Sequence, residues 1–225
     1  MAETGYTLVI GDKNFSSWSL RPWLAMRAAG IPFAEEHVRL RQKETKQAIL
    51  CHSPSGKVPA LKAGGEVVWD SLAILEFLAE RHPDKRLWPQ DPAARAAARS
   101  ISAEMHAGFA TLRNDMPMDL LARLPVPPIG EALAAEIQRI VAIWIEARAR
   151  FGAGGPYLFG AFTNADAMYA PVVTRFRTYG VDLAAFGDDS TASAYAGAIL
   201  AMPPIAAWTE GAAAELRERR TEAEG

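Results

Sequence analysis

Residues 6–40 read YTLVIGDKNFSSWSLRPWLAMRAAGIPFAEEHVRL, and this stretch decides the fold of the first part of the chain. Tyr6–Ile10 is a short apolar run that predicts a buried strand. A helical pattern starts at Ser19, which we expect to act as its cap, and stops at Gly30. Phe33–Leu40 predicts a second strand. Strand, helix and strand in so short a path form a βαβ unit, so the two strands are expected to lie parallel.

A hairpin and a helix are expected to follow. Val58–Leu61 and Glu66–Trp69 are brief apolar runs joined by a segment that ends in Gly64-Gly65, which suits a tight turn between antiparallel strands. Asp70-Ser71 can cap the next helix, whose apolar stripe ends before His82-Pro83.

The rest of the chain predicts helices only. Residues 93–124 form one long helix or two, broken near Met116-Pro117, and an amphipathic helix runs through Leu133 and Arg148. Thr163 and Asp166 have the spacing of a capping signal, and the helix they open contains Pro171, where we expect a kink. The last helical region spans residues 192–220 and is interrupted at Pro203-Pro204.

The polar, proline-containing stretch before these helices predicts a linker. We therefore expect an α/β domain over residues 1–82, a linker over residues 83–92 and an all-helical domain over residues 93–225.

Composition excludes several classes of function. Lysine and arginine total 24 against 26 acidic residues, a net charge of −2 that is too balanced for non-specific binding of nucleic acid or an anionic membrane. Cys51 is the only cysteine, which suits a reducing compartment. Residues 1–4 lack the start of a signal peptide, and the sequence has no apolar run long enough to span a bilayer. A cytoplasmic location is expected.

The loop at residues 14–19 is the first candidate for chemistry, because ligands of open α/β sheets bind beyond the carboxyl ends of the parallel strands. Hydroxyl groups there would meet unpaired helix amides, which favour an anion such as a thiolate. The local sequence does not distinguish between a functional role and a turn role for Ser16 and Ser17.

Two further segments have an ordinary and a functional interpretation. Pro59 begins a short strand, and a trans bond is the more common state; a cis bond would turn the backbone of Val58 outward, where it could pair with an extended peptide. Asp70 and Ser71 form an ordinary helix cap, or hold a ligand that carries both an ammonium and a carboxylate group.

Metal catalysis finds no support in the sequence. The histidines, at positions 37, 52, 82 and 106, show no metal-ligand spacing with one another or with Cys51. Cys51 itself lies in a connecting segment rather than at a helix N-terminus, so we expect it to be inert.

Taken together, residues 16–21 (SSWSLR), 53–61 (SPSGKVPAL), 70–74 (DSLAI) and 158–172 (LFGAFTNADAMYAPV) resemble the cytosolic glutathione transferase family over nearly the whole chain. The resemblance implies an α/β thioredoxin-like N-terminal domain and an all-α C-terminal domain. It also implies a homodimer with glutathione as cosubstrate, no metal, and a cis bond before Pro59.

Roles for single residues follow from the resemblance. Ser16, with Ser17 as the alternative, would donate a hydrogen bond to the glutathione sulfur. The remaining glutathione contacts would come from the Val58-Pro59 backbone, from Lys57 at the glycyl carboxylate, and from Asp70 with Ser71 at the γ-glutamyl end. A hydroxyl donor and helix amides lower the pKa of a thiol and so raise the thiolate concentration.

The second substrate, a small electrophile, would bind against the helical domain near Met105, His106, Phe109 and Arg113. His106 and Arg113 are seven residues apart and so share a helix face that could bind an acidic substrate, although solvated or paired charges on an ordinary helix explain them equally well. The serine loop is most similar to the zeta class, which includes maleylacetoacetate isomerases, although that class usually carries Cys in place of Trp18.

Three functions follow as hypotheses. The first is conjugation of glutathione to small electrophiles. The second is a glutathione-dependent cis/trans isomerase or a reductive thiol-transfer enzyme. The third is a non-catalytic glutathione-binding protein.

Overall fold

The structure is a computed structural model that describes residues 5–224. Residues 1–4, on which the expectation of no signal peptide rests, lie outside the described part. The N-terminal region alternates strands with helices, in the order β1 (Tyr6–Ile10), α1 (Ser17–Ala28), β2 (Phe33–His37), α2 (Thr45–Leu50), β3 (Ala60–Ala63), β4 (Glu66–Trp69) and α3 (Ser71–Arg81).

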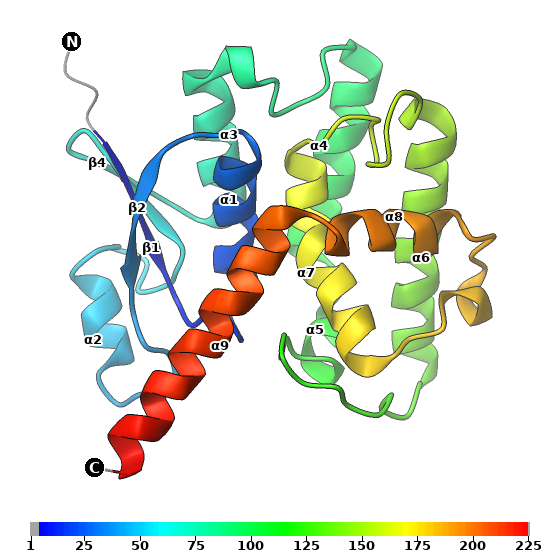
Figure 1. Cartoon of the computed structure of the whole chain (residues 1–225). Helices are drawn as coiled ribbons and strands as arrows, with labels where there is room; N and C mark the ends of the chain where they lie inside the picture. Colours follow the sequence, from blue (N-terminus) through cyan, green and yellow to red (C-terminus); the bar gives the residue numbers. More distant parts are fainter. Residues whose placement is uncertain (1–4, 225) are drawn as a thin grey trace.

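The strands form one mixed sheet in the order β2-β1-β3-β4. The pair β1 and β2 is parallel, with Tyr6 opposite Phe33, and β3 pairs antiparallel with both β1 and β4. The predicted βαβ unit and the predicted hairpin are therefore confirmed. Together with the helical C-terminal region, this sheet confirms the expected fold class (Figure 1).

The start of α1 differs from the prediction. Ser16, not Ser19, is the N-cap, because its Oγ accepts a hydrogen bond from the Ser19 backbone N–H at 3.4 Å. Ser19 lies inside the first turn, where its own Oγ accepts from Gly11 N–H at 3.1 Å. The cap thus falls on one of the two serines that were candidates for chemistry.

Two other details of the N-terminal region were wrong or missing. Strand β2 ends at His37 rather than at Leu40. The Leu40 backbone N–H donates instead to the Asp12 carboxylate, at 3.1 Å. The short helix α2 was not predicted, and it places Cys51 at a helix C-terminus.

The C-terminal region contains helices α4 to α9, with the bounds α4 (Pro92–Ala107), α5 (Ala110–Asp115), α6 (Glu131–Phe151), α7 (Asn164–Tyr179), α8 (Thr191–Leu200) and α9 (Pro203–Glu224). Short 3₁₀ turns lie at Pro83–Lys85 and Leu183–Phe186. The sequence predicted that a break near Met116-Pro117 separates two helices, and this is wrong, because α5 ends at Asp115 and the next helix begins only at Glu131. The chain already breaks at Gly108-Phe109, where Phe109 has a left-handed φ of 57°.

The capping signal at the start of α7 is confirmed. The Asp166 carboxylate accepts from the Thr163 N–H at 2.8 Å and from the Thr163 hydroxyl at 3.1 Å, and it also accepts from Leu158 N–H at 3.0 Å. The helix continues through Pro171 to Tyr179. Because α7 is buried almost along its whole length, it forms the axis of the helical region.

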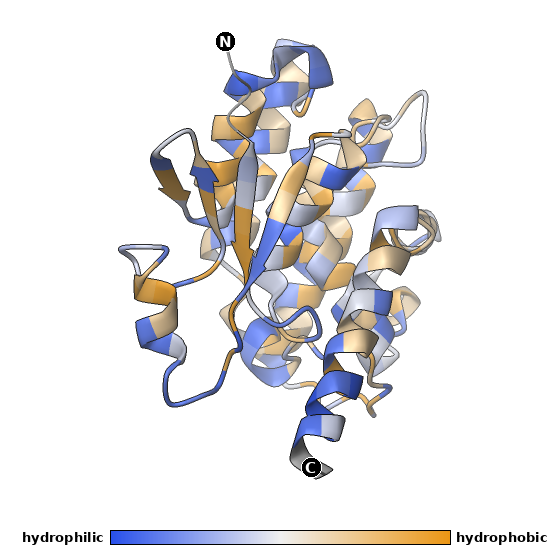
Figure 2. Ribbon diagram, turned by 60° about the vertical axis from the view of Figure 1, so that its left-hand side comes forward, coloured by the Kyte–Doolittle hydropathy of each residue, from blue (hydrophilic) through white to orange (hydrophobic). Residues whose placement is uncertain are grey.

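Sheet and helices share one hydrophobic core, in which α1 packs directly on α7. Leu87 and Trp88, inside the segment expected to be a linker, are buried in that core, so the segment is fixed against both regions. The C-terminal half of α9 is hydrophilic and runs back along the N-terminal region (Figure 2). Within residues 5–224, none of the helices combines the length and apolarity that crossing a membrane needs.

Candidate active site

Two cavities meet between the N-terminal region and the helical region, and Trp18, Lys57 and Val58 border both of them. The first has a volume of about 410 Å³ and the second about 460 Å³. Each is large enough for a small ligand.

The first cavity collects every residue that the sequence assigned to glutathione binding. It is lined by Lys57, Val58, Pro59, Asp70 and Ser71, together with Trp18, Ser55, Trp69 and His106. The Val58–Pro59 peptide bond is cis, which confirms what the resemblance implied and not the trans state favoured by local sequence alone. These residues come from the loop before β3 and from the start of α3, segments that the sheet brings together.

Asp70 and Ser71 open α3 at one end of this cavity. Asp70 has a φ of 76°, which is uncommon for a non-glycine residue, and its Oδ1 accepts from Leu72 N–H at 2.9 Å. The Ser71 hydroxyl is buried and has no hydrogen-bond partner among the described residues. A buried hydroxyl without a partner costs free energy, so this oxygen suits a ligand group.

His106 reaches the first cavity rather than the second. Its Nε2 lies 3.3 Å from Asp70 Oδ2, and its ring stands edge-on to Trp18 with 5.3 Å between the ring centroids. From the sequence, His106 is expected at the second substrate; in the structure α4 carries it to the Asp70 end of the cleft, in the first cavity.

The second cavity contains both candidate serines. Ser16 donates a hydrogen bond to Ser19 Oγ at 2.8 Å, and Ser17 Oγ accepts one from Arg175 Nη2 at 3.3 Å. Both hydroxyls lie at the N-terminus of α1, where unpaired N–H groups and the helix dipole favour an anion. The position is suited to holding a thiolate.

Positive charge gathers around the serines. Arg113 and Arg175 line the second cavity with Arg41. Arg175 is 4% exposed and forms no ion pair with a carboxylate among the described residues; burial and the nearby Arg113 guanidinium lower its pKa to about 10. A buried cation without a counter-ion is costly, so this cavity favours an anionic ligand.

A second buried arginine lies beneath Trp18. The Arg21 guanidinium is 3.9 Å from the centroid of the Trp18 ring and fully buried, and both its terminal nitrogens lack hydrogen-bond partners among the described residues. Burial, and then repulsion from Arg175 and Arg113, hold the pKa of Arg21 well below its usual range. Arg21 thus adds to the positive field at the N-terminus of α1.

Two predicted pocket residues are part of the core instead. Met105 is fully buried and Phe109 is 7% exposed, and both pack in the shared hydrophobic core rather than lining either cavity. Of the residues expected around the second substrate, only Arg113 borders the cavity with the serines. The left-handed turn at Phe109 separates α4 from α5, so His106 and Arg113 lie on different helices and do not share one helix face as the sequence predicted.

Comparison with known families decides what this cleft belongs to. A model described as "Glutathione S-transferase, N-terminal domain" matches residues 15–81, and one described as "Glutathione S-transferase, C-terminal domain" matches residues 128–211. The chain belongs to the glutathione S-transferase family. It is a glutathione-dependent enzyme.

Relatives of this glutathione S-transferase carry a narrower name. A "Probable maleylacetoacetate isomerase" of Caenorhabditis elegans is 31% identical over 176 residues, which is 77% of this chain and 80% of the worm protein. A "Maleylpyruvate isomerase" of Ralstonia sp is 31% identical over 180 residues, 75% of this chain and 82% of that protein. The "Maleylacetoacetate isomerase" of Rattus norvegicus is 36% identical over 105 residues, 45% of this chain and 48% of the rat protein.

Solved structures confirm the fold of this transferase. A "GLUTATHIONE TRANSFERASE homolog" from Burkholderia with bound glutathione has a TM-score of 0.68 at 22% identity, and the match covers 92% of this chain and 97% of that one. An "epsilon-class glutathione S-transferase" of the housefly Musca domestica has a TM-score of 0.70 at 22% identity, covering 96% of this chain and 97% of that one.

Several residues of the transferase cleft were missed from the sequence. Arg175 lies on a helix whose period gives no sign that one arginine turns into a cavity, and Arg41 lies in a polar loop. Trp18 borders both cavities. The one indication of this in the sequence is that Trp18 stands where the zeta class usually has Cys.

Proposed function

We propose that this transferase catalyses the glutathione-dependent cis/trans isomerisation of a small unsaturated acid of the maleyl type. The observation that carries the proposal is that curated relatives matching about three quarters of the chain are named maleylacetoacetate or maleylpyruvate isomerase. They favour the isomerase hypothesis over general conjugation of electrophiles, which remains plausible for the family.

The charge of the second cavity supports an acidic substrate. Arg41, Arg113 and Arg175 border it, and Lys57 lies at its junction with the first cavity. A substrate with two carboxylates would supply the counter-charge that buried Arg175 does not find among the described residues.

The cleft residues would divide the work between them. Lys57 would bind the glycyl carboxylate of glutathione, Val58 its cysteinyl backbone, and Asp70 with Ser71 its γ-glutamyl end. Ser16, with Ser17 as the alternative, would donate a hydrogen bond to the sulfur. This donor, the amides of α1 and the nearby arginines stabilise the charged form of a thiol and so lower its pKa.

Glutathione supplies a thiolate that adds reversibly to the conjugated double bond, so that rotation about the resulting single bond and release of the thiolate give the trans isomer without net redox change. Arg113 and Arg175 would stabilise the negative charge that the addition moves onto the substrate. The serines would not act as nucleophiles, because neither has a histidine or carboxylate hydrogen-bond partner among residues 5–224.

The test compares two substrates with the same enzyme preparation. We expect turnover of maleylacetone that requires glutathione, and a lower kcat/KM for 1-chloro-2,4-dinitrobenzene, a neutral aryl halide. Conjugation of the aryl halide without any turnover of maleylacetone would contradict the proposal and restore the conjugation hypothesis.

We also propose that the enzyme is a cytoplasmic homodimer, as the resemblance implies. On β4, Val67 is 37% exposed and Trp69 is 45% exposed, and an apolar pair at a sheet edge suits a subunit contact. Light scattering after size exclusion is expected to give twice the chain mass of 24.4 kDa. A mass of one chain at micromolar concentration would contradict the dimer.

A further inference from the structure

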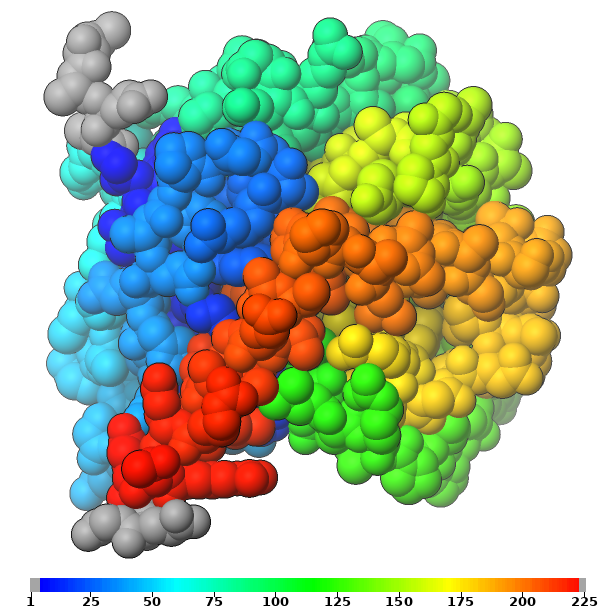
Figure 3. Space-filling model, viewed as in Figure 1, coloured from blue at the N-terminus to red at the C-terminus, as the bar shows by residue number. Residues whose placement is uncertain are grey.

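The last helix, α9, leaves the helical region beside α8, and its C-terminal end lies against the N-terminal region (Figures 1 and 3). Glu215, Arg219 and Glu222 lie on one face of α9, at the spacing of successive turns. Each makes an ion pair with the last residue of β2 or with the loops that follow β1 and β2: Glu215 with Lys13 and His37, Arg219 with Asp12, and Glu222 with Arg39.

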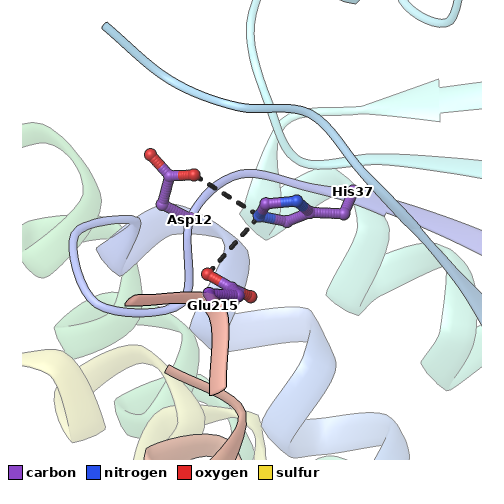
Figure 4. Close-up of side chains that lie close together, drawn as sticks. All are labelled: Asp12, His37 and Glu215. Carbon is purple, nitrogen blue, oxygen red and sulfur yellow. Dashed lines mark ion pairs between the residues drawn. The ribbon is translucent and has the colours of Figure 1, made fainter. Parts of the chain in front are cut away.

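Asp12, His37 and Glu215 form the centre of this contact (Figure 4). His37 Nε2 lies 3.4 Å from Asp12 Oδ1 and 3.5 Å from Glu215 Oε2, and the Asp12 side chain is 2% exposed. The three have the atom types of a metal site, with one ligand atom from each within 4.8 Å of the others. We assign them to ion pairing, because Arg219 and Lys13 already face the two carboxylates.

Several ion pairs share members in this cluster. Lys13 and Arg27 both pair with Glu35, at 2.7 and 3.0 Å, so four cations (Lys13, Arg27, His37 and Arg219) face three carboxylates (Asp12, Glu35 and Glu215). A partly buried network of several pairs holds its members in place better than an isolated surface pair does.

Asp12 also holds the loop that carries the serines. Its backbone carbonyl accepts from Ser16 N–H at 2.8 Å and from Phe15 N–H at 3.0 Å. The neighbouring Lys13 carbonyl accepts from Trp208 Nε1 of α9 at 2.8 Å. One residue therefore connects α9, through its side chain, to the N-cap serine of α1, through its main chain.

We infer that Glu215 and Arg219 of α9 are positioning residues for the active site, which fix the loop of Ser16 and Ser17. Arg219 acts through Asp12, and Glu215 acts through His37 and through the Lys13 backbone N–H, from which its Oε2 accepts a hydrogen bond at 2.9 Å. The inference rests on the proposed role of these serines toward the glutathione thiol. Without the ion pairs, the Asp12 carboxylate loses its tie to α9, and the loop gains freedom that misplaces the hydroxyl donors.

The test uses three variants of the full chain. Arg219→Gln removes the pair with Asp12, Arg219→Lys keeps the charge, and Arg217→Gln is the control, since Arg217 is exposed on the same helix and makes no ion pair within the described residues. Two quantities are measured: hydrogen exchange of the amides in residues 12–19, and the pH dependence of kcat/KM for glutathione.

For Arg219→Gln we expect exchange in residues 12–19 to become about fivefold faster, as for the loss of one partly buried ion pair. The acid limb of the pH profile should move to higher pH, because a misplaced donor no longer lowers the thiol pKa. Arg219→Lys should restore most of both effects, and Arg217→Gln should match the parent enzyme. If Arg219→Gln does not fold, Glu215→Gln takes its place.

Exchange and pH profile equal to those of Arg217→Gln would overturn the inference, whatever happens to thermal stability. Faster exchange with an unmoved acid limb would overturn it as well, because α9 would then restrain the loop without affecting the thiol. The exchange measurement needs no substrate, so a failed isomerase assay leaves it intact.

Discussion

At the scale of single residues, the cleft is defined by hydroxyls and guanidinium groups placed at the start of one helix. Ser16 caps α1 and Ser17 accepts from Arg175, so the two neighbouring serines have different partners. The Ser16 hydroxyl, which donates to Ser19, can turn toward a sulfur without losing its role as acceptor of the Ser19 N–H. Their different bonds make the two serines separable by substitution.

We predict that Ser16→Ala lowers kcat/KM about 10- to 100-fold, the loss expected for one hydrogen bond to a charged group. Ser17→Ala should have a smaller effect, because its oxygen already accepts from Arg175. Steady-state rates at pH 7 check both variants, with Ser100→Ala on the exposed face of α4 as the control. An unchanged rate in Ser16→Ala would remove this residue from the mechanism.

Arg175 should affect acidic and neutral substrates differently. We predict that Arg175→Gln raises KM for maleylacetone about tenfold, since one charged hydrogen bond is lost, and leaves KM for the neutral aryl halide nearly unchanged. Arg175→Lys keeps the charge, so its KM for maleylacetone should lie between that of the parent enzyme and that of Arg175→Gln. Equal increases for both substrates would mean that Arg175 only supports the loop at Met116, whose carbonyl accepts from its Nε at 2.9 Å.

At the scale of elements, the start of α7 stabilises the helical region, and the end of α9 contacts the N-terminal region. Asp166 is buried, and burial raises its pKa to about 6, although the three hydrogen bonds from Leu158 and Thr163 oppose the shift. These bonds satisfy buried donors that would otherwise have no acceptor. The capping box therefore contributes to stability even though its carboxylate is buried.

We predict that Asp166→Ala lowers the free energy of unfolding by about 2 kcal/mol, the range for losing a helix cap together with buried hydrogen bonds. Urea unfolding followed by circular dichroism measures the loss. Asp182→Ala is a matched control, because Asp182 caps only the short 3₁₀ turn at Leu183–Phe186. An equal decrease in the free energy of unfolding in the two variants would contradict the prediction that the α7 cap contributes more to stability than the Asp182 cap does.

The α9 contact should make stability depend on pH. Hydrogen bonds to Asp12 and then Glu215 raise the pKa of His37 from 6.5 to about 9. Because the folded state binds this proton more tightly, the stabilisation is fully present below pH 6.5 and is lost as the pH rises through 9. Lys13 and Arg219 also face this cluster.

We therefore predict that the free energy of unfolding falls between about pH 6.5 and 9, and that His37→Asn flattens this part of the curve. Chemical unfolding at a series of pH values measures it. A parent protein whose stability is constant over the window would show that the His37 proton is not coupled to folding.

At the scale of the whole molecule, local patterns predicted most of the fold. The βαβ unit, the hairpin with its Gly64-Gly65 turn and the capping box at Thr163 depend on neighbouring residues, and all are found. The break at Phe109 was missed because a left-handed φ there follows from packing and not from the residue type.

Site residues that belong to sequence motifs could be predicted, whereas residues that only tertiary contacts bring to the site could not. Lys57, Val58, Pro59, Asp70 and Ser71 line one cavity, as expected from the family resemblance. The contact among Asp12, His37 and Glu215 joins positions near both ends of the chain, and the burial of Arg175 depends on how the segment after α5 docks. No local pattern contains this information.

The central claim is that the cleft uses a glutathione thiol to isomerise a cis-unsaturated acid. Proton NMR of maleylacetone with the enzyme tests it directly, with free glutathione in one sample and S-methylglutathione, which has no thiol, in the other. We predict conversion to the trans isomer with glutathione and none with the methylated form. No conversion with glutathione, or equal conversion in both samples, would contradict the account.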